Sequence, residues 1–459
     1  MAVASAYPNY QPLRSRWVPR VPEHWSLLRA KNFLREIDER SKTGEEALLS
    51  MRMQRGLVPH NDVSVKRIAP ENLISYKKAQ PDELVLNRMQ AGNAMFFRNR
   101  QPGLVSPDYA VFRLLRNDNP EYLGHLFRSW PMRGLFRSES KGLGTGTSGF
   151  LRLYSDRFTA LEIPLPPRPE QDQIAAYLRA QDAHIARFIK AKRDLIKLLT
   201  EQKLRIIDHA VTRGLDATVT LKPSGIEWLG EVPEHWDVSK VKLLADYING
   251  FPFKPAEWGA KGRPIIRIQN LTKEHAAFNY YDGAVPERNH VKDGDILLSW
   301  SASLGVFVWN RGDAWLNQHI FKVVPDPKRI TRGYFVWLAR WFLNHMEAEA
   351  HGSTMQHITK PKFGSFPVPL PSLSEQVEIE AHINRETKDI DLAIARTEEE
   401  IKLIREYRDR LIADVVTGQV DVRSWQPGAD DVVGDDVLTA LGDDEAEAAE
   451  EGEADGEEN

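Results

Sequence analysis

The chain has 459 residues, with 61 Lys and Arg against 65 Asp and Glu, a formal net charge of −4, and no cysteine. This length is enough for about three domains, each with its own core. The absence of cysteine excludes disulfides, thiolate metal ligands and cysteine nucleophiles, and it suits a cytoplasmic location. Residues 1–17 lack the apolar core of a signal peptide. The longest apolar run, residues 334–343, is interrupted by Arg340 and is too short to span a bilayer, so we expect no membrane partner.

Several short sequences occur twice along the chain. VPEHW is found at residues 21–25 and again at 232–236, and the proline-rich PLPPRPEQ of residues 164–171 is nearly repeated as PLPSLSEQ at 369–376. The stretches between these motifs align poorly with each other. Self-similarity of this kind is the signature of a duplicated architecture. Each half of the chain is therefore predicted to have a variable globular part followed by a repeated part.

The first globular part is predicted to cover residues 18–168. DELVLNRMQAG (residues 82–92) and GLVSPDYAVFRL (residues 103–114) have the alternation and the glycine turns of short strands. Arg88 stands at the end of the first of these strands, where an arginine can make a bidentate contact with a guanine edge of DNA. The alternative interpretation of such a residue, as an ordinary loop residue, stays open.

A long helix is predicted for residues 169–213. The prolines just before it cannot belong to a helix, so they should form an extended approach to it. Apolar residues recur along the helix in a heptad pattern that predicts a buried seam. The seam residues are Leu178, Ile185, Ile189, Ile196, Leu199 and Ile206. Lys192 and Lys203 occupy two further slots of this pattern, which favours a short, specific pairing over a fibre.

The second globular part is predicted to cover residues 224–373. Its strand-like segments are GRPIIRIQNLT (262–272), DGDILLSWSASLG (293–305) and AWLNQHIFKVV (314–324). Polar and basic side chains at their ends can contact base edges or phosphates. The candidates are Lys254, Arg267, Gln269, Asn270 and Ser299. HGSTMQHI, residues 351–358, is predicted to be a loop, and its Gln356 is a further candidate for DNA contact.

A second long helix is predicted for residues 374–420, and Ser372 with Glu375 forms a capping box at its start. A shift of 205 residues aligns it with the first helix without a gap. Its seam residues are Ile383, Ile390, Ile394, Ile401, Ile404 and Leu411. Two helices with equivalent stripes most simply bury them against each other. We therefore expect an antiparallel coiled-coil pair with a pseudo-twofold and a globular part at each end.

The last segment, residues 426–459, carries 14 Asp and Glu and no Lys or Arg. The remaining chain has 61 basic against 51 acidic residues, an excess of 10, which favours a polyanionic partner. The tail is predicted to be disordered, because its composition of Ala, Gly, Asp and Glu cannot bury a core. Two interpretations of the tail remain open. It keeps the chain soluble, or it competes with DNA for basic grooves.

The motifs of an enzyme are missing from the sequence. A stand-alone DNA methyltransferase needs an Asn/Asp-Pro-Pro-aromatic motif and a glycine-rich cofactor turn, and a nuclease needs an Asp paired with Glu-x-Lys. None of these is present. We therefore expect no catalysis, no metal site and no cofactor in this chain.

The duplicated motifs, taken in order, resemble those of the DNA-specificity subunits of type I restriction-modification systems. The resemblance extends to about Arg423. Its carriers are PLPPRPEQDQIAAYL, PLPSLSEQVEIEAHI, the two VPEHW motifs, GLVSPDY, GDILLSW and NQHIF. By position, the family's motif segments include Ser106, Asp108 and Tyr109 in the first globular part and Asn317, Gln318 and His319 in the second. The acidic tail is not part of the family pattern.

The resemblance implies an α+β chain of two globular α/β target-recognition domains separated by a helical spacer. Each domain would recognise one half of a bipartite, asymmetric sequence in double-stranded DNA. The helices would also dock two modification (methyltransferase) subunits, which carry S-adenosylmethionine, and restriction (motor/nuclease) subunits with ATP and magnesium would join them. The alternative is a helical scaffold that brings protein partners together without sequence-specific DNA recognition.

Overall fold

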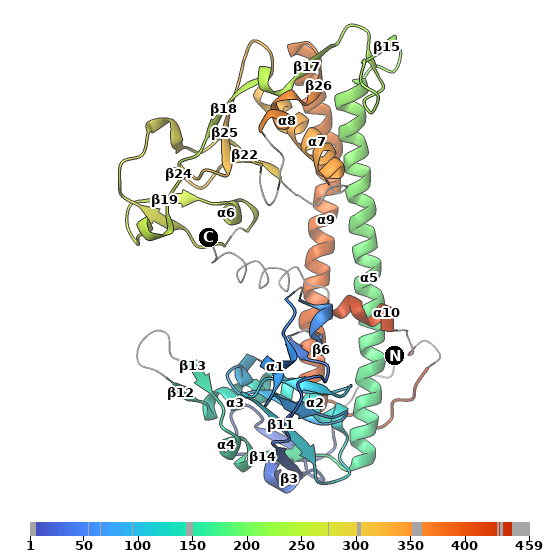
Figure 1. The fold of residues 1–459 in the computed structure, drawn as a ribbon. Coiled ribbons are helices and arrows are strands. Elements are labelled where there is room, and N and C mark those ends of the chain that lie inside the picture. Colours follow the sequence, from blue (N-terminus) through green and yellow to red (C-terminus); the bar gives the residue numbers. More distant parts are fainter. Residues whose placement is uncertain are drawn as a thin grey trace. The chain divides into compact units, whose positions relative to one another are not determined.

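The fold is given by a computed structural model of the chain. The residues that it describes are 6–53, 55–64, 66–93, 95–143, 150–273, 275–300, 304–350, 360–428, 431 and 435–442. The chain divides into two compact units (Figure 1). Unit 1 contains Met1–Leu195 and Thr397–Asn459, and unit 2 contains Ile196–Arg396. Each of two long helices contributes one part to each unit.

Unit 1 is built around a four-stranded antiparallel sheet with the strand order β4-β11-β8-β9. Its strands are β1 (Tyr10–Pro12), β2 (Arg20–Pro22), β3 (Ser26–Arg29), β4 (Leu34–Ile37), β5 (Leu49–Arg52), β6 (Gly56–Pro59), β7 (Lys77–Ala79), β8 (Leu84–Asn87), β9 (Phe96–Arg98), β10 (Gly103–Val105), β11 (Tyr109–Leu114), β12 (Lys141–Leu143), β13 (Phe150–Arg152) and β14 (Glu162–Leu165). Its shorter helices are α1 (Pro70–Leu73), α2 (Pro120–Arg128), α3 (Trp130–Glu139), α4 (Ser155–Ala160) and α10 (Asp435–Leu438).

An aromatic cluster fills the core of unit 1 between this sheet and the helices that follow it. The Phe96 ring lies 4.8 Å from that of Phe127 on α2 and 5.2 Å from that of Phe158 on α4. Asn119 caps α2 by accepting hydrogen bonds from the amides of Glu121 and Tyr122. Each buried phenylalanine contributes about 2 kcal/mol by burial, so these contacts fix α2 and α4 on the sheet.

Unit 2 contains two four-stranded sheets, with the strand orders β18-β25-β22-β23 and β20-β19-β24-β21. Its strands are β15 (Leu221–Pro223), β16 (Glu231–Pro233), β17 (Asp237–Lys240), β18 (Ala245–Asn249), β19 (Arg263–Ile266), β20 (Asn279–Tyr281), β21 (His290–Val291), β22 (Ile296–Ser299), β23 (Gly305–Val308), β24 (Ala314–Leu316), β25 (Ile320–Pro325) and β26 (Pro367–Leu370). Its shorter helices are α6 (Ile268–Thr272), α7 (Arg332–Ala350) and α8 (Lys360–Ser365).

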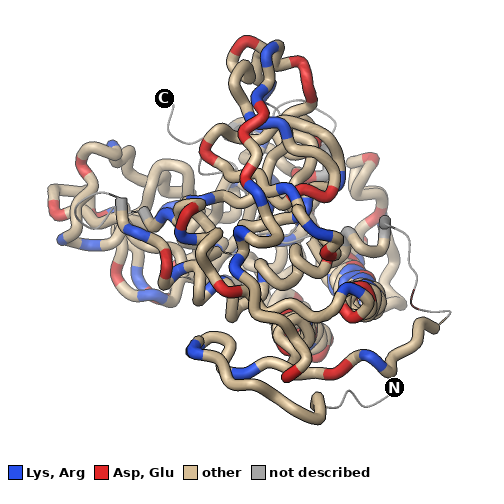
Figure 2. The backbone as a smooth tube through the Cα atoms, turned by 90° about the horizontal axis from the view of Figure 1, so that it is seen from below, with Lys and Arg blue, Asp and Glu red and all other residues tan. Residues whose placement is uncertain are grey.

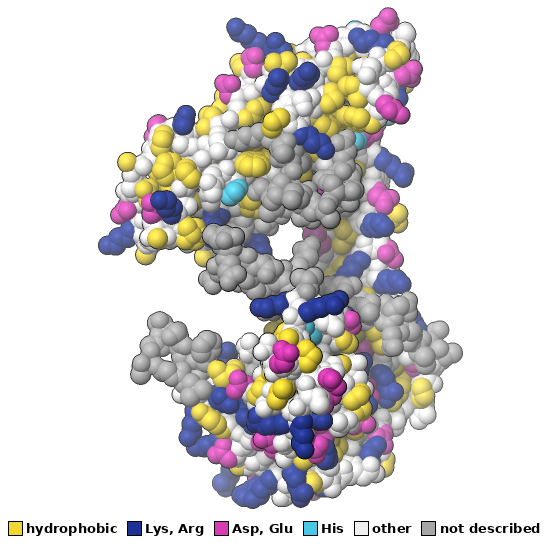
Figure 3. All heavy atoms as spheres, viewed as in Figure 1, with side chains coloured by type: hydrophobic (Ala, Val, Ile, Leu, Met, Phe, Trp, Pro, Cys, Tyr) yellow, Lys and Arg dark blue, Asp and Glu magenta, His cyan; other side chains and the backbone are white. Residues whose placement is uncertain are grey.

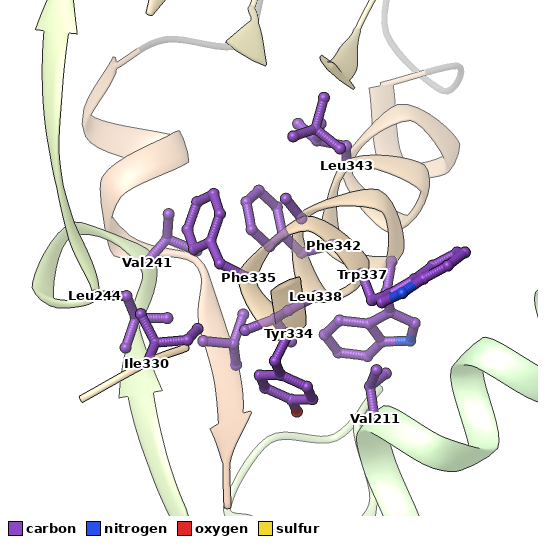
Figure 4. Close-up of a cluster of buried hydrophobic side chains, with 14 of the residues drawn as sticks. Val211, Val241, Leu244, Ile330, Tyr334, Phe335, Trp337, Leu338, Phe342 and Leu343 are labelled. Carbon is purple, nitrogen blue, oxygen red and sulfur yellow. The ribbon is translucent and has the colours of Figure 1, made fainter. Parts of the chain in front are cut away.

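Helix α7 forms the centre of the main core of unit 2. Figure 4 shows its side chains Tyr334, Phe335 and Phe342 pointing into a cluster with Val211 of the first long helix and Val241. The apolar run that is too short to span a membrane is therefore a buried helix of a globular core. Among the described residues, no helix is long and apolar enough to cross a bilayer.

The two globular parts share one sheet topology although their sequences align poorly. Strands β4, β11, β8 and β9 of unit 1 correspond in order and direction to β18, β25, β22 and β23 of unit 2. A helix follows the central strand in both units, α2 in one and α7 in the other. The expectation of two α/β domains is confirmed, and the domains are variants of a single scaffold.

The long helices are α5 (Arg168–Arg213), of 46 residues, and α9 (Leu373–Val416), of 44 residues. They run antiparallel in both units, as predicted. In unit 1, Asp182 pairs with Arg408 at 2.6 Å and Lys192 pairs with Glu400 at 2.5 Å. In unit 2, Lys203 pairs with Asp391 at 2.5 Å. Both helices carry acidic and basic residues along their sequences, and Figure 2 shows Lys, Arg, Asp and Glu on the helices seen nearly end-on.

All of the predicted seam residues are buried or half-buried. Leu178, Ile185, Ile189, Ile383, Ile390 and Ile401 are buried, and Ile196, Leu199, Ile206, Ile394, Ile404 and Leu411 are half-buried. The basic residues in seam slots, Lys192, Lys203 and Arg408, are those that make the ion pairs between the helices. Because these pairs are not repeated symmetrically, they favour one register of the two helices.

Helix α9 ends at Val416, earlier than the expected residue 420. Gly418 follows it with a φ of +72°, in the left-handed region that ends helices and favours glycine. The chain then turns back to the first hairpin of unit 1, where Gln419 exchanges hydrogen bonds with Arg20.

Candidate nucleic-acid interface

The two repeated motifs of each half meet in space. The proline-rich segment of unit 1 begins within β14, which ends at Leu165 and pairs with β3, directly after the first VPEHW. In unit 2 the repeated segment begins within β26, which ends at Leu370 and pairs with β17, directly after the second VPEHW. The extended approach that the prolines predict is therefore one strand of a two-stranded ribbon. Proline is compatible with this place because such a ribbon leaves one side of each strand unpaired.

A glutamate at the start of each long helix binds the His and Trp of VPEHW. Glu170 accepts hydrogen bonds from Trp25 Nε1 at 2.9 Å and from Tyr7 Oη at 2.6 Å, and it lies 2.7 Å from His24 Nε2. This carboxylate is buried. It satisfies the buried donors of Tyr7 and Trp25, which have no access to water, so it holds the globular part on the helix end.

The equivalent Glu375 of unit 2 lies 2.7 Å from His235 Nε2 and accepts from Trp236 Nε1 at 3.1 Å. Ser372 completes the predicted capping box, since its amide donates to Glu375 at 3.1 Å. Burial alone would raise the pKa of Glu375, but the hydrogen bonds from His235, Ser372 and Trp236 outweigh it and lower the pKa to about 2.

A glutamine next to each of these glutamates joins the long helix to a helix of the globular part. In unit 1, the Asn119 amide donates to Gln171 Oε1 at 2.7 Å, at the start of α2. In unit 2, the Thr331 amide donates to Gln376 Oε1 at 2.7 Å, at the start of α7. Both glutamines are buried. The repeated Glu-Gln pair thus fixes the orientation of each globular part through the backbone.

A glycine after each long helix packs against a VPEHW tryptophan. A Cβ on Gly418, after α9, would lie 3.1 Å from the Trp25 ring and 2.3 Å from Pro22. A Cβ on Gly214, after α5, would lie 3.1 Å from the Trp236 ring. In each unit, the end of one long helix and the start of the other therefore meet at the same tryptophan. We call this arrangement the helix mount: Trp25, Glu170 and Gly418 in unit 1, and Trp236, Glu375 and Gly214 in unit 2.

The candidate residues Ser106, Asp108 and Tyr109 lie in unit 1 at the start of the central strand β11. Tyr109 pairs with Asn87, the last residue of β8. The Ser106 hydroxyl accepts from the Asp108 amide at 3.3 Å, which forms a tight turn. Asp108 is exposed, and Arg152 of β13 lies 3.8 Å from its carboxylate. We call this end of the sheet, where β11 starts and β8 ends, the sheet edge. It presents an acceptor and a basic donor side by side.

The candidates Asn317, Gln318 and His319 occupy the equivalent place in unit 2. They lead into β25, whose first residue Ile320 pairs with Ser299 at the end of β22. The Gln318 amide donates to Asn317 Oδ1 at 2.7 Å, and the Gln318 and His319 side chains lie 3.2 Å apart. The sequence motifs of the two halves, although different, therefore mark the same edge of the same sheet.

Arg267 lies beside this edge in unit 2. The Asn317 amide donates to the carbonyl of Ile266, the residue before Arg267, at 3.3 Å. The Arg267 guanidinium lies 4.7 Å from the Trp258 ring centre and donates to Asn279 Oδ1 at 3.2 Å. Gln269 is half-buried on α6, and Lys254 is exposed on the loop after β18. A stacked arginine is held in one orientation, which suits bidentate recognition of a base or phosphate.

Three candidate residues have structural partners that make DNA contact unsuitable for them. Arg88 forms an ion pair with Glu36 and donates to Ser155 Oγ at 3.1 Å. Asn270 is fully buried, accepts from the Arg267 amide at 3.0 Å and donates to the carbonyl of Ala277 at 3.1 Å. Ser299 is fully buried in β22. We therefore withdraw these three from the candidate interface. Gln356 lies outside the described residues.

Sequence reasoning missed several residues of the two edges. Arg152, Trp258 and Asn279 lie beside the predicted candidates but belong to segments without a recognisable motif. It also missed that the repeat starts upstream of VPEHW, where β1 pairs with β2 and β15 pairs with β16 in the same register. Pro12 and Pro223 end the first strand of each hairpin, and this shared proline is the signal that could have found the longer repeat.

On the face of unit 1 that Figure 3 shows, the surface charge is mixed and does not form one uniform basic patch. Figure 3 shows Lys and Arg side chains spread over this unit among Asp and Glu. Within the described residues, no group of three or more His, Asp or Glu has an arrangement that could hold a metal ion. The chemistry that the two edges offer is hydrogen bonding by amide, imidazole, carboxylate and guanidinium groups.

The chain matches a family model described as type I restriction modification DNA specificity domain over residues 74–198 and 233–403. Over 197 residues it is 25% identical to the EcoBI specificity subunit of Escherichia coli, which is 42% of this chain and 41% of that protein. It is 26% identical over 321 residues to the MjaVIII specificity subunit of Methanocaldococcus jannaschii, 65% of this chain and 71% of that protein.

A solved chain from a study of complex assembly and conformational transition in the type I R-M system has a similar fold. The TM-score is 0.58 at 16% sequence identity, and the match covers 86% of this chain and 98% of that one. The fold likeness and the family match agree with the resemblance carried by the duplicated motifs. They do not favour a helical scaffold that lacks sequence-specific DNA recognition.

Proposed function

Because this chain belongs to the type I restriction modification DNA specificity family, we propose that it is a non-catalytic subunit that recognises a bipartite, asymmetric DNA sequence. Unit 1 recognises one half of the target and unit 2 the other half. The observation that carries this proposal is the equivalence of the two sheet edges. Residues 106–109 precede β11 and residues 317–319 precede β25, at the same place in the same topology.

The side chains at these edges have the chemistry of base recognition. Glutamine and asparagine can make two hydrogen bonds with an adenine edge, and arginine can make two with guanine. Gln318 and Arg267 supply these groups in unit 2, and Asp108 and Arg152 supply an acceptor and a donor in unit 1. Because the two edges differ in sequence, the two halves of the target should differ as well.

The paired long helices are proposed to set the distance between the two half-sites. A continuous helix of 46 residues is roughly 70 Å long, against about 34 Å for one turn of DNA. The ion pairs between α5 and α9 favour one register, and a fixed register gives a fixed spacing. Lengthening both helices by one heptad adds roughly 10 Å, which corresponds to about three base pairs of unread spacer.

The long helices also offer docking surfaces for partner subunits. In unit 1, Phe188 and Leu195 on α5 and Leu403 and Tyr407 on α9 are large apolar side chains that remain exposed. Unit 2 has a second such set with Leu198, Leu204 and Leu392. Exposed apolar residues on a helix typically mark a protein interface. We propose that each set binds one modification subunit, so that two methyltransferase subunits with S-adenosylmethionine dock on the chain. Restriction subunits, with ATP and magnesium, join this core.

The proposal is tested by mapping methylated bases in the genome of the host. The expected target is a split, asymmetric motif with a constant spacer. A continuous motif would contradict the proposal. Substituting Gln318→Ala should then relax one half of the motif by about 1–3 kcal/mol, roughly 5- to 150-fold in binding. Lys328→Ala is the matched control, because this exposed lysine lies past the other end of β25.

A further inference from the structure

Unit 1 contains a cavity of about 470 Å³ between β6, β9 and α2 on one side and the long helices on the other. Its lining is strongly basic. The arginines that line it are Arg55, Arg98, Arg100, Arg128, Arg179 and Arg408, and the acidic residues are Glu121 and Asp182. Six guanidinium groups against two carboxylates leave an excess of four positive charges around one space. Arg98 at the end of β9 pairs with Leu84 at the start of β8, whereas the sheet edge proposed to contact DNA bases lies where β8 ends at Asn87. The excess of positive charge therefore lies at the other end of these strands.

Arg128, at the end of α2, stands out among these arginines. Its Nη2 donates to the Met53 carbonyl at 2.8 Å, and its guanidinium lies 4.2 Å from the Phe97 ring centre. Its Nε is buried and has no hydrogen-bond partner within the described part of the chain. Burial lowers the pKa of Arg128 to about 10, and the group stays charged at neutral pH. The side chain as a whole is half-buried and forms no ion pair with a described carboxylate, so its charge gains from an anion placed in the cavity.

Only some of the remaining arginines have their charge balanced by a neighbour. Arg408 binds Asp182 through two hydrogen bonds of 2.6 and 2.9 Å. Arg98 and Arg179 both contact Glu121, at 3.5 and 3.2 Å. Arg55 and Arg100 are exposed and form no ion pair with any described residue. Three guanidinium groups, those of residues 55, 100 and 128, are therefore available to an anionic ligand.

The C-terminal part of the chain leads to this cavity. We call the described residues of this part, 425–428, 431 and 435–442, the C-terminal strap. Its Trp425 carbonyl accepts from Gln173 Nε2 at 2.6 Å, and Asp431 pairs with His184 at 2.7 Å. The Ala440 carbonyl accepts from Arg193 Nη1 at 3.0 Å. Beyond these contacts, Leu438, Leu441 and Gly442 themselves line the cavity. The strap therefore follows α5 and brings the chain to the rim of the basic cavity at Gly442.

The sequence that follows the strap is a polyanion. Residues 443–459 contain 10 Asp and Glu among 17 residues, and no Lys or Arg. We propose that the arginine-lined cavity is a binding site for the carboxylates of this tail, with Arg55, Arg100 and Arg128 as the donors. Arginine pairs with carboxylates through two parallel hydrogen bonds, and such pairs gain strength in a partly water-excluded cavity. Because the strap tethers the tail to the cavity, binding of the tail is intramolecular, and the effective concentration of the tail is in the millimolar range.

A tail bound in this way competes with other polyanions for unit 1. DNA phosphates present the same acceptor chemistry, so the bound tail weakens non-specific contacts of unit 1 with DNA. This consequence rests on the proposed DNA-binding function. The cavity assignment itself does not, because it concerns only the chain and its own tail.

The test uses a chain that ends at Gly442 and a fluorescent peptide with the sequence of residues 443–459. At low salt, fluorescence anisotropy should show saturable binding that weakens as salt rises. The full-length chain should bind the same peptide at least tenfold more weakly, because its own tail occupies the cavity. Absence of saturable binding, or equal affinity for the two chains, would overturn the proposal.

Substitutions locate the site without disturbing the core. The double variant Arg55→Ala/Arg100→Ala of the shortened chain changes two exposed side chains and should bind the peptide at least tenfold more weakly. Arg157→Ala, an exposed arginine on α4 away from the cavity, should leave binding unchanged. Equal peptide affinity for the double variant and this control would refute the assignment. Displacement of the peptide by a short non-specific DNA duplex would support competition, and binding without displacement would refute the competition while leaving the cavity site intact.

Discussion

Replacing Glu170 with alanine should destabilise unit 1 more than the equivalent change at Glu375 destabilises unit 2. The Glu170 side chain is only 7% exposed, and it accepts from the buried donors Tyr7 and Trp25. Neither donor can turn to water when the carboxylate is removed, and a buried donor left without a partner costs about 1–3 kcal/mol. The loss of both partners should lower the free energy of unfolding by about 4 kcal/mol. His24 adds no cost, because it is exposed and can bind water instead.

The cost in unit 2 is smaller because its helix mount is more open. Glu375 is 31% exposed, and among its partners only Trp236 is a buried donor. Loss of this one hydrogen bond gives about 2 kcal/mol. The two substitutions should therefore differ by about 2 kcal/mol although the motifs are the same.

Hydrogen exchange followed by mass spectrometry measures the two units separately within the full chain. With about 1.4 kcal/mol per factor of ten, Glu170→Ala should speed exchange of the β3 and β14 amides by roughly a thousandfold. Glu375→Ala should speed exchange of β17 and β26 by roughly thirtyfold. Glu23→Ala, at the exposed position next to His24, should change stability by less than about 0.5 kcal/mol. Equal effects in the two units, or unchanged exchange in β3, would refute the role assigned to the buried donors.

Three further predictions concern the helices and pH. Asp182→Ala leaves the half-buried Arg408 without its partner in the seam and should lower the free energy of unfolding in urea by about 2–4 kcal/mol. The control Glu399→Ala, at an exposed position, should lower it by less than about 0.5 kcal/mol. Similar losses for the two variants would contradict the role of the Asp182–Arg408 pair in the seam. Gly418→Ala should cost more than about 1 kcal/mol, because alanine disfavours a φ of +72° and its Cβ would meet Pro22; an unchanged Tm would show that the helix end rearranges freely. The stabilisation from Glu375 should be fully present above pH 4.5, its ordinary pKa, and be lost as the pH falls towards about 2. This stabilisation amounts to at most about 3 kcal/mol. Glu375→Gln should remove the contribution of Glu375 to the acid dependence of unit 2 stability. An unchanged dependence of stability on acid pH in this variant would argue against the lowered pKa of Glu375.

The repeated part of the chain can be predicted from sequence because its signals are local. A heptad pattern and a capping box lie within one helix, so the extent of α5 and α9 and the burial of their shared stripe follow from spacing alone. The end of α9 differs by four residues because the sequence pattern continues past Val416, whereas the backbone turns at Gly418 against Pro22. That contact joins residues far apart in the chain, and no local pattern contains it.

The common scaffold of the variable parts cannot be found by aligning sequences. A buried strand requires apolar side chains but not particular ones, so LVLN in β8 and ILLS in β22 serve the same place. The partners of single polar residues are equally hidden. Arg88 has the residue type and the position expected of a DNA contact, but it forms an ion pair with Glu36 on β4. Only the fold shows which polar residues at strand ends are already occupied by the chain.

Recognition of a bipartite target depends on the independence of the two sheet edges, and a domain exchange tests this independence most directly. Residues 241–366 of unit 2 would be replaced by the corresponding segment of a relative, with the helix mount and both long helices kept. The methylated target of the complex with its modification subunits would then be mapped for both chains. We predict that one half of the target changes while the other half and the spacer length remain the same. A change in both halves, or in the spacer alone, would contradict the account.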